Sequence, residues 1–118
     1  MGVVNRTVVL IRPDEPYRDW MLAGEETAEA VDTIFEEMRR DGTAYMLPET
    51  EDAGAIAELL KEAWAAIFEH ELVAWMEDEA AWPPERTFEM FLDWFTVEIA
   101  SIVVDLCDWE LATYQGEA

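Results

Sequence analysis

The chain has 118 residues, a length typical of one domain, and its apolar fraction of 52% excludes an acidic disordered protein. It carries 28 acidic and 7 basic side chains, a formal net charge of −21, so its surface would repel nucleic-acid phosphates. One cysteine excludes a disulfide-stapled miniprotein and a zinc ribbon. We therefore expect one globular domain over residues 1–118 that does not bind nucleic acid directly.

No apolar run approaches the roughly 20 residues that a membrane-spanning helix requires. Residues 1–13 also lack a basic region that leads into a long apolar stretch, and they carry no signal-cleavage pattern. These features predict a cytoplasmic protein that does not contact a membrane.

The first part of the chain predicts one strand and two helices. Residues 3–11 alternate as a strand would, with two sets of side chains on opposite faces. Asp14 is expected to cap a short helix that stops at Gly24. Thr27 is expected to cap a second helix, whose apolar residues follow a 3.6-residue period and which ends at Gly42.

The second part predicts two strands and two further helices. Residues 43–47 form a short strand, and Asp52 caps a long helix at residues 53–76. A Pro-rich loop separates this helix from a fourth helix at residues 85–94. Residues 97–106 are expected to form the last strand, buried on both faces at its centre.

The predicted order is therefore β-α-α-β-α-α-β. This order indicates an α+β or α/β domain in which about four helices pack on a small three-stranded sheet. The connections between the strands are long and helical, so parallel pairing is open to them. The segment from residue 107 to the end of the chain carries no clear pattern.

Motifs for catalysis and for metal or cofactor binding are absent from the sequence. The chain has no G-x-G-x-x-G, Walker A or G-x-S-x-G pattern. A zinc-protease motif needs a second His four residues after His70, but that position is Ala74. An E-x-x-H metal motif needs a Glu three residues before His70, but that position is Ile67. Cys107 is expected to be a small buried apolar residue, because nothing places a base beside it. We therefore predict no catalytic residue, no metal and no cofactor.

Positive charges are the more informative charges in so acidic a chain. Arg6 lies inside the first predicted strand, and Arg86 follows the rigid turn that begins at Trp82. One interpretation is an anion or carboxylate pocket that these three residues form together. The other is a set of internal salt bridges, which the excess of acids favours. The candidate acidic partners are Glu98, Asp105 and Glu89.

The six Trp residues fall into two groups. Trp64, Trp75 and Trp94 lie on the apolar faces of predicted helices and are expected in the core. Trp20 and Trp82 lie beside caps and turns, where we expect exposure. An exposed Trp beside acids is a common interface anchor.

Four sequence blocks carry a resemblance to a known family. They are NRTVVLIRP (5–13), TAYMLPE (43–49), WPPERTFEMFLDWF (82–95) and VEIASIVVDL (97–106). With the segment at residues 68–75, they resemble a family of small acidic bacterial proteins of unknown function. The resemblance covers most of the chain and implies a cytoplasmic bacterial protein with one domain. It carries over no catalytic residue.

These features favour a non-enzymatic interaction module whose acidic face binds a basic protein, with Trp20 or Trp82 as anchor. The alternative is a small enzyme or ligand-binding domain with an anion pocket near Arg6, Arg86 and Trp82. A second alternative is a salt-adapted homo-oligomer. The acidity itself has two explanations, because salt adaptation and recognition of a partner produce the same charge.

Overall fold

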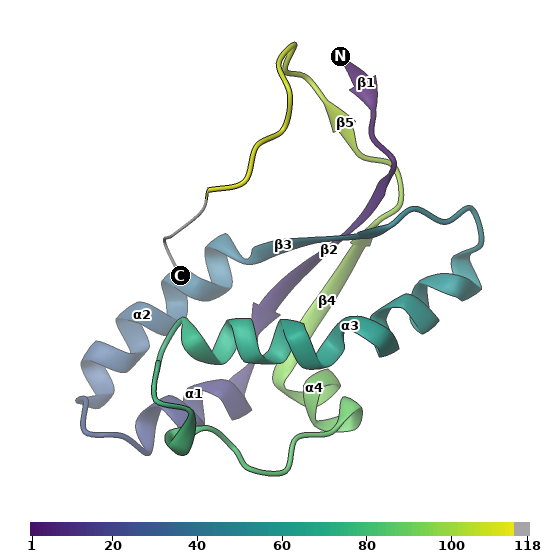
Figure 1. The fold of residues 1–118 in the computed structure, drawn as a ribbon. Helices are drawn as coiled ribbons and strands as arrows, with labels where there is room; N and C mark the ends of the chain where they lie inside the picture. Colours follow the sequence, from purple (N-terminus) through teal and green to yellow (C-terminus); the bar gives the residue numbers. More distant parts are fainter. Residues whose placement is uncertain (115–118) are drawn as a thin grey trace.

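A computed structural model describes residues 1–114 of the chain, and its elements alternate between strands and helices (Figure 1). In chain order they are β1 (Gly2–Val3), β2 (Arg6–Pro13), α1 (Glu15–Leu22), α2 (Ala28–Asp41), β3 (Thr43–Pro48), α3 (Ala53–Val73), the 3₁₀ helix η1 (Glu79–Ala81), α4 (Phe88–Trp94), β4 (Phe95–Ala100) and β5 (Val104–Asp105). The chain therefore has an α+β fold, as the predicted order of elements indicates.

The main sheet has three strands in the order β3-β2-β4, and both pairings are antiparallel. Parallel pairing is not realised, because α1 and α2 together return the chain to the end of the sheet where β2 finished. Thr43 at the start of β3 therefore pairs with Ile11 near the end of β2. After β3, the 21-residue helix α3 crosses back over about 30 Å, so β4 also starts beside the end of β2.

The two faces of β2 differ in the way that its alternation predicts. Thr7, Val9, Ile11 and Pro13 are buried, whereas the side chains between them are not. Helix α3 lies across the buried face, and α1, α2 and α4 gather at the end of the sheet where β2 finishes (Figure 1). The opposite face is called the outer face below, and among residues 1–114 no helix covers it.

Aromatic rings form the centre of the core. The ring of Phe68 on α3 lies 5.3 Å from that of Phe95 and 5.4 Å from that of Trp94, between ring centroids. The ring of Tyr17 on α1 lies 5.7 Å from that of Phe95. Edge-to-face and tilted contacts of this kind stabilise a fold beyond the apolar area they bury. They connect α1, α3, α4 and β4.

The helix caps explain where the helices begin. The side chain of Thr27 accepts a hydrogen bond from the backbone N–H of Ala30, and that of Asp52 accepts one from Gly54, as expected for both. Asp14 lies at the first helix cap but its side chain makes no cap hydrogen bond. It binds Arg39 and Thr96 instead, so it joins α2 to β4.

Several predicted boundaries are wrong. The predicted strand at residues 3–11 is two strands, β1 and β2, with a break at residues 4–5. Helix α3 ends at Val73 instead of residue 76, and α4 begins at Phe88 instead of residue 85, because Thr87 caps it. The predicted strand at residues 97–106 is two strands, β4 and β5, with a break between them. It is not buried on both faces, since half of Ile99 and 74% of Ile102 are exposed.

A narrow ribbon extends the sheet beyond the helices. In it β1 pairs with β5, and the N–H of Val4 donates to the carbonyl of Val103 over 2.8 Å. We call residues 1–5 and 101–106 the arm and residues 107–114 the tail (Figure 1). The radius of gyration, 15.8 Å, exceeds the roughly 13 Å of a compact domain of this length because the arm projects. Cys107 is exposed at the start of the tail, so its expected burial is wrong.

Gly42 ends α2 with a φ of 65°, a conformation that side chains with a Cβ rarely adopt. A Cβ at this position would also lie 3.0 Å from Cδ1 of Leu10. We therefore expect Gly42→Ala to lower the free energy of unfolding by about 1–2 kcal/mol in urea denaturation. Gly24→Ala is the matched control, because its Cβ would meet only a carbonyl oxygen at 3.5 Å. An equal effect of the two substitutions would contradict this account of Gly42.

Candidate functional site

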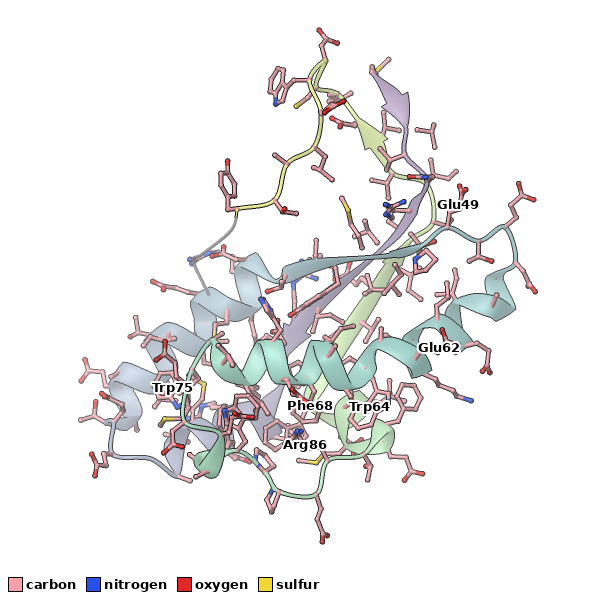
Figure 2. All side chains as sticks on the ribbon, in the orientation of Figure 1. Glu49, Glu62, Trp64, Phe68, Trp75 and Arg86 are labelled. Atoms are coloured by element: carbon pink, nitrogen blue, oxygen red, sulfur yellow. The ribbon has the colours of Figure 1, made fainter. Side chains whose placement is uncertain are left out.

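A small pocket lies between the end of α1 and the segment that follows α3. Its volume is about 130 Å³, and its lining residues are Trp20, Ala23, Gly24, Trp75, Met76 and Ala81. Figure 2 labels Trp75, which belongs to this lining. We call this cavity the aromatic pocket, because Trp20 and Trp75 are among its lining residues.

Two indole N–H groups hold the chain that forms one wall of the pocket. The indole N–H of Trp20 donates to the carbonyl of Ala81 over 3.0 Å. That of Trp82 donates to the carbonyl of Met76 over 2.7 Å, within the same segment. Buried indole N–H groups need such partners, so these bonds fix the segment between α3 and η1.

Five carboxylates lie next to the lining residues in the sequence, and all five side chains are exposed. We call them the acidic rim: Glu25, Glu26, Glu77, Asp78 and Glu79. Among residues 1–114 no Lys or Arg forms an ion pair with any of them. Aromatic faces attract cations, and nearby carboxylates strengthen that attraction. The pocket therefore suits the side chain of a Lys or an Arg.

Trp82 and Arg86 lie together, but they form an internal contact and not an open pocket. Trp82 is only 8% exposed, so its expected exposure is wrong. The guanidinium of Arg86 lies 5.7 Å from the centroid of the Trp82 ring and donates to the carbonyl of Pro83 over 2.8 Å. It also pairs with Glu69 over 3.4 Å. The salt bridge that we considered for Arg86 exists, with Glu69 as its partner.

Arg6 lies far from this contact, at the start of β2 beside Pro48. Its exposed guanidinium donates to the backbone carbonyl of Asn5 over 2.8 Å and to its side-chain oxygen over 2.7 Å. Arg86 lies beyond the other end of β2 (Figures 1 and 2). The structure therefore does not bring Arg6, Arg86 and Trp82 into one anion pocket. Trp20, partly buried, is the candidate residue that lines a cavity.

A buried carboxyl on α3 is the second unusual feature. Glu71 is 3% exposed, and the hydroxyl of Tyr45 on β3 donates to its Oε2. Burial raises the pKa of Glu71 above its ordinary value, and hydrogen bonds from Tyr45 and Thr43 and the charge of His70 oppose that rise. Its backbone carbonyl accepts a hydrogen bond of 2.5 Å from the hydroxyl of Tyr17.

The two tyrosines beside Glu71 respond to the same environment. Burial raises the pKa of Tyr17 and that of Tyr45, and the nearby carboxylate of Glu71 raises both further. The hydroxyl of Tyr45 also lies 2.8 Å from Nδ1 of His70. Together these groups join β3, α1 and α3 through hydrogen bonds. A cavity of about 270 Å³ borders Glu71 on the side of α2.

The sequence carries a signal for the buried carboxyl of Glu71. This residue lies four positions after Ile67 and three after Phe68, so it interrupts the apolar stripe of the long helix. An acid in that position requires a hydrogen-bonding partner in the core.

Comparison with protein-family models, curated proteins and solved structures finds no match for this chain. The resemblance to a family of small acidic bacterial proteins therefore remains a prediction. In the part of the chain that the structure describes, no helix is long and apolar enough to cross a membrane. Residues 1–114 also contain no group of three or more His, Cys, Asp or Glu placed to hold a metal ion.

Arg86 is expected to be structural, because its guanidinium joins α3 to the turn before α4. We expect Arg86→Ala to lower the free energy of unfolding by about 1–2 kcal/mol, which thermal denaturation would measure. Arg40→Ala is the control, since Arg40 is largely exposed and pairs only with the neighbouring Asp41. Unchanged stability of Arg86→Ala would show that the contact is not structural.

The raised pKa of Glu71 predicts how stability depends on pH. A carboxyl that holds its proton more tightly when folded destabilises the fold as pH rises above its ordinary value of 4.5. The penalty is complete once pH exceeds the raised pKa. Glu71→Gln removes this penalty and keeps an oxygen that accepts from Tyr45. The melting temperature of the variant, minus that of wild type, should therefore rise with pH above 4.5.

Glu62→Gln is the matched control for this pH series, because Glu62 is exposed on the same helix. Its difference from wild type should stay nearly constant across the series. A constant difference for Glu71→Gln as well would contradict the burial of an ionisable carboxyl at this position.

Proposed function

We propose that this chain is a non-enzymatic interaction module that binds a basic protein at the aromatic pocket. The observation that carries the proposal is the combination of an indole-lined cavity with five carboxylates that form no ion pair within residues 1–114. Of the residues predicted as anchors, Trp20 contributes to this surface, and Trp75 takes the place of Trp82.

A Lys or Arg side chain of the partner would use both parts of the site. Its aliphatic stem would pack on Trp20, Trp75 and Met76, as long cationic side chains do on apolar surfaces. Its charged end would reach the acidic rim. A cation over an aromatic ring contributes about 0.5–2 kcal/mol, depending on how far it is desolvated.

The rest of the surface supports the same partner chemistry. Four of the Arg side chains are used in pairs that join one element to another, so most carboxylates stay uncompensated. A field of one sign accelerates the approach of an oppositely charged protein and excludes partners of like charge. Salt screens such a field, so affinity should fall as ionic strength rises.

The anion-pocket alternative has less support. The guanidinium of Arg86 already interacts with Glu69, the Pro83 carbonyl and the Trp82 ring. An anionic ligand would have to displace the Glu69 carboxylate in a chain whose net charge is −21. The same excess of negative charge would repel that ligand on its approach.

A lysine-rich peptide of ten residues, labelled with fluorescein, provides a direct test. The rim variant replaces four rim glutamates by glutamine: Glu25, Glu26, Glu77 and Glu79. Asp78 is kept, because it caps η1. We expect the dissociation constant at low salt, measured by fluorescence anisotropy, to rise by about tenfold or more, since each close charge pair contributes to affinity.

The control variant removes the same amount of charge elsewhere. It replaces four exposed glutamates that have no ion pair: Glu49, Glu51, Glu62 and Glu89. Glu49 and Glu62 lie far from Trp75 (Figure 2). This variant should weaken binding by no more than about threefold, through the general field alone. Equal losses in both variants would make the charge a solubility feature and end the proposal.

The aromatic part of the site has its own variant. Trp75→Leu keeps an apolar wall but removes the ring face, so we expect a loss of about 3–10-fold in affinity. Circular dichroism would establish that the variant is folded. Unchanged affinity in a folded Trp75→Leu would exclude the pocket as the binding site.

A further inference from the structure

Exposed apolar side chains concentrate on the arm and the tail. Of the thirteen large apolar side chains that are exposed among residues 1–114, eight lie there. They are Met1, Val3, Ile102, Val104, Leu106, Trp109, Leu111 and Tyr114. Monomeric proteins rarely expose apolar side chains so densely, and such surfaces mark interaction sites.

The outer face of the sheet is a second uncovered apolar surface. On this face the central strand β2 carries Val8 and Leu10, which lie between their partner residues on β3 and β4. Val8 lies between Met46 and Ala100, and Leu10 lies between Ala44 and Glu98, whose carboxylate pairs with Arg12. Nearly half of the Met46 side chain is exposed. A sheet face of this composition is ordinarily covered by another layer.

Arg6 lies at the edge of this face and differs from the other cationic side chains. Six of the seven Lys and Arg side chains form ion pairs with carboxylates. Among residues 1–114, Arg6 instead donates only to the neighbouring Asn5. Its guanidinium is therefore available to a carboxylate of another molecule, with which it would form a charge-assisted hydrogen bond.

We propose that this chain forms a two-fold dimer in which the tail of each copy docks on the outer face of the other. The tail carries Trp109, 74% exposed, between Asp108 and Glu110 in the sequence. Asp108 lies 3.7 Å from the N-terminal ammonium of Met1, whereas Glu110 forms no ion pair among residues 1–114. The outer face offers an apolar strip beside the guanidinium of Arg6, which has no carboxylate partner among residues 1–114. One chain therefore carries two complementary surfaces, the tail and the outer face. In a two-fold dimer the tail of each copy lies on the outer face of the other, so both contacts form at once.

The apolar side chains of the tail are not packed on the outer face of the same chain. Its large apolar side chains stay highly exposed, with Tyr114 at 89%, and the tail turns back from the arm toward α2 (Figure 1). Trp and Tyr each bury up to about 150–250 Å², and the face beneath them is covered as well. Two reciprocal tails therefore reach the range of roughly 1,200–2,000 Å² of stable interfaces.

Salt should act on this dimer in the opposite direction from its effect on the basic partner. Two copies that each carry −21 repel one another, and screening removes that repulsion while apolar contact remains. Sedimentation equilibrium of the full chain should show a larger fraction of dimer at 1 M NaCl than at 0.05 M. A monomer at every salt concentration up to 1 M would overturn the proposal.

The tail variant replaces Trp109 and Leu111 by Ser. We expect it to raise the dimer dissociation constant by about thirtyfold or more, because buried aromatic side chains dominate interfaces. Its control replaces by Ser two other exposed apolar residues, Val73 (45% exposed) on α3 and Leu92 (47% exposed) on α4. The control should change the constant by less than about threefold. A dimer unaffected by the tail variant would overturn the docking.

The charge contact has a rescue test. Arg6→Glu should weaken the dimer by about tenfold, and adding Asp108→Arg with Glu110→Arg should recover most of that loss. Absence of recovery would exclude Arg6 as the site where the tail docks. None of these substitutions changes the aromatic pocket or the acidic rim. Peptide binding should therefore remain in a dimer-deficient chain, so the two proposals can fail separately.

Discussion

The ring of Phe68 lies against those of Trp94 and Phe95, and the rest of the fold depends on this contact. A chain with a net charge of −21 repels itself in any compact state, so electrostatics cannot be the force that collapses it. Burial of apolar area must supply that force. The aromatic cluster does so where the long helix α3, the short helix α4 and β4 meet. Tyr17 extends it to α1, so one cluster connects elements distant in sequence.

The few cationic side chains are used where the fold needs links between its elements. Arg39 joins α2 to Asp14 before α1, Arg12 joins β2 to Glu98 on β4, and Arg86 reaches Glu69 on α3. Pairs that are partly shielded from water contribute more than exposed ones. Most carboxylates, those of the acidic rim among them, therefore have no ion-pair partner among residues 1–114. The guanidinium of Arg6 has no carboxylate partner there either.

Local patterns predicted the elements well but predicted their pairing poorly. Thr27 and Asp52 identified two helix starts, and alternation along β2 identified its buried face. Whether two strands pair in parallel or antiparallel depends on which end of the sheet the connecting helices bring the chain back to. A short stretch of sequence does not contain that information. Trp82 shows the same limit, because its turn suggests exposure, whereas the carbonyl of Met76 accepts its indole N–H. The pocket between Trp20 and Trp75 joins residues 55 positions apart, and only the folded chain shows it.

The two proposed contacts rest on different physical forces, so one small domain could make both. Identical copies carry the same charge, so a contact between them must rest on apolar area with at most a local ion pair. A basic partner has the opposite charge, so its contact gains from the field of the whole molecule. Eight of the thirteen exposed large apolar side chains among residues 1–114 lie on the arm and tail, whereas the acidic rim lies at the opposite end, near α1 and η1 (Figure 1). Self-association would therefore leave the rim open, and two copies would offer a basic partner two sites and an avidity that neither site has alone.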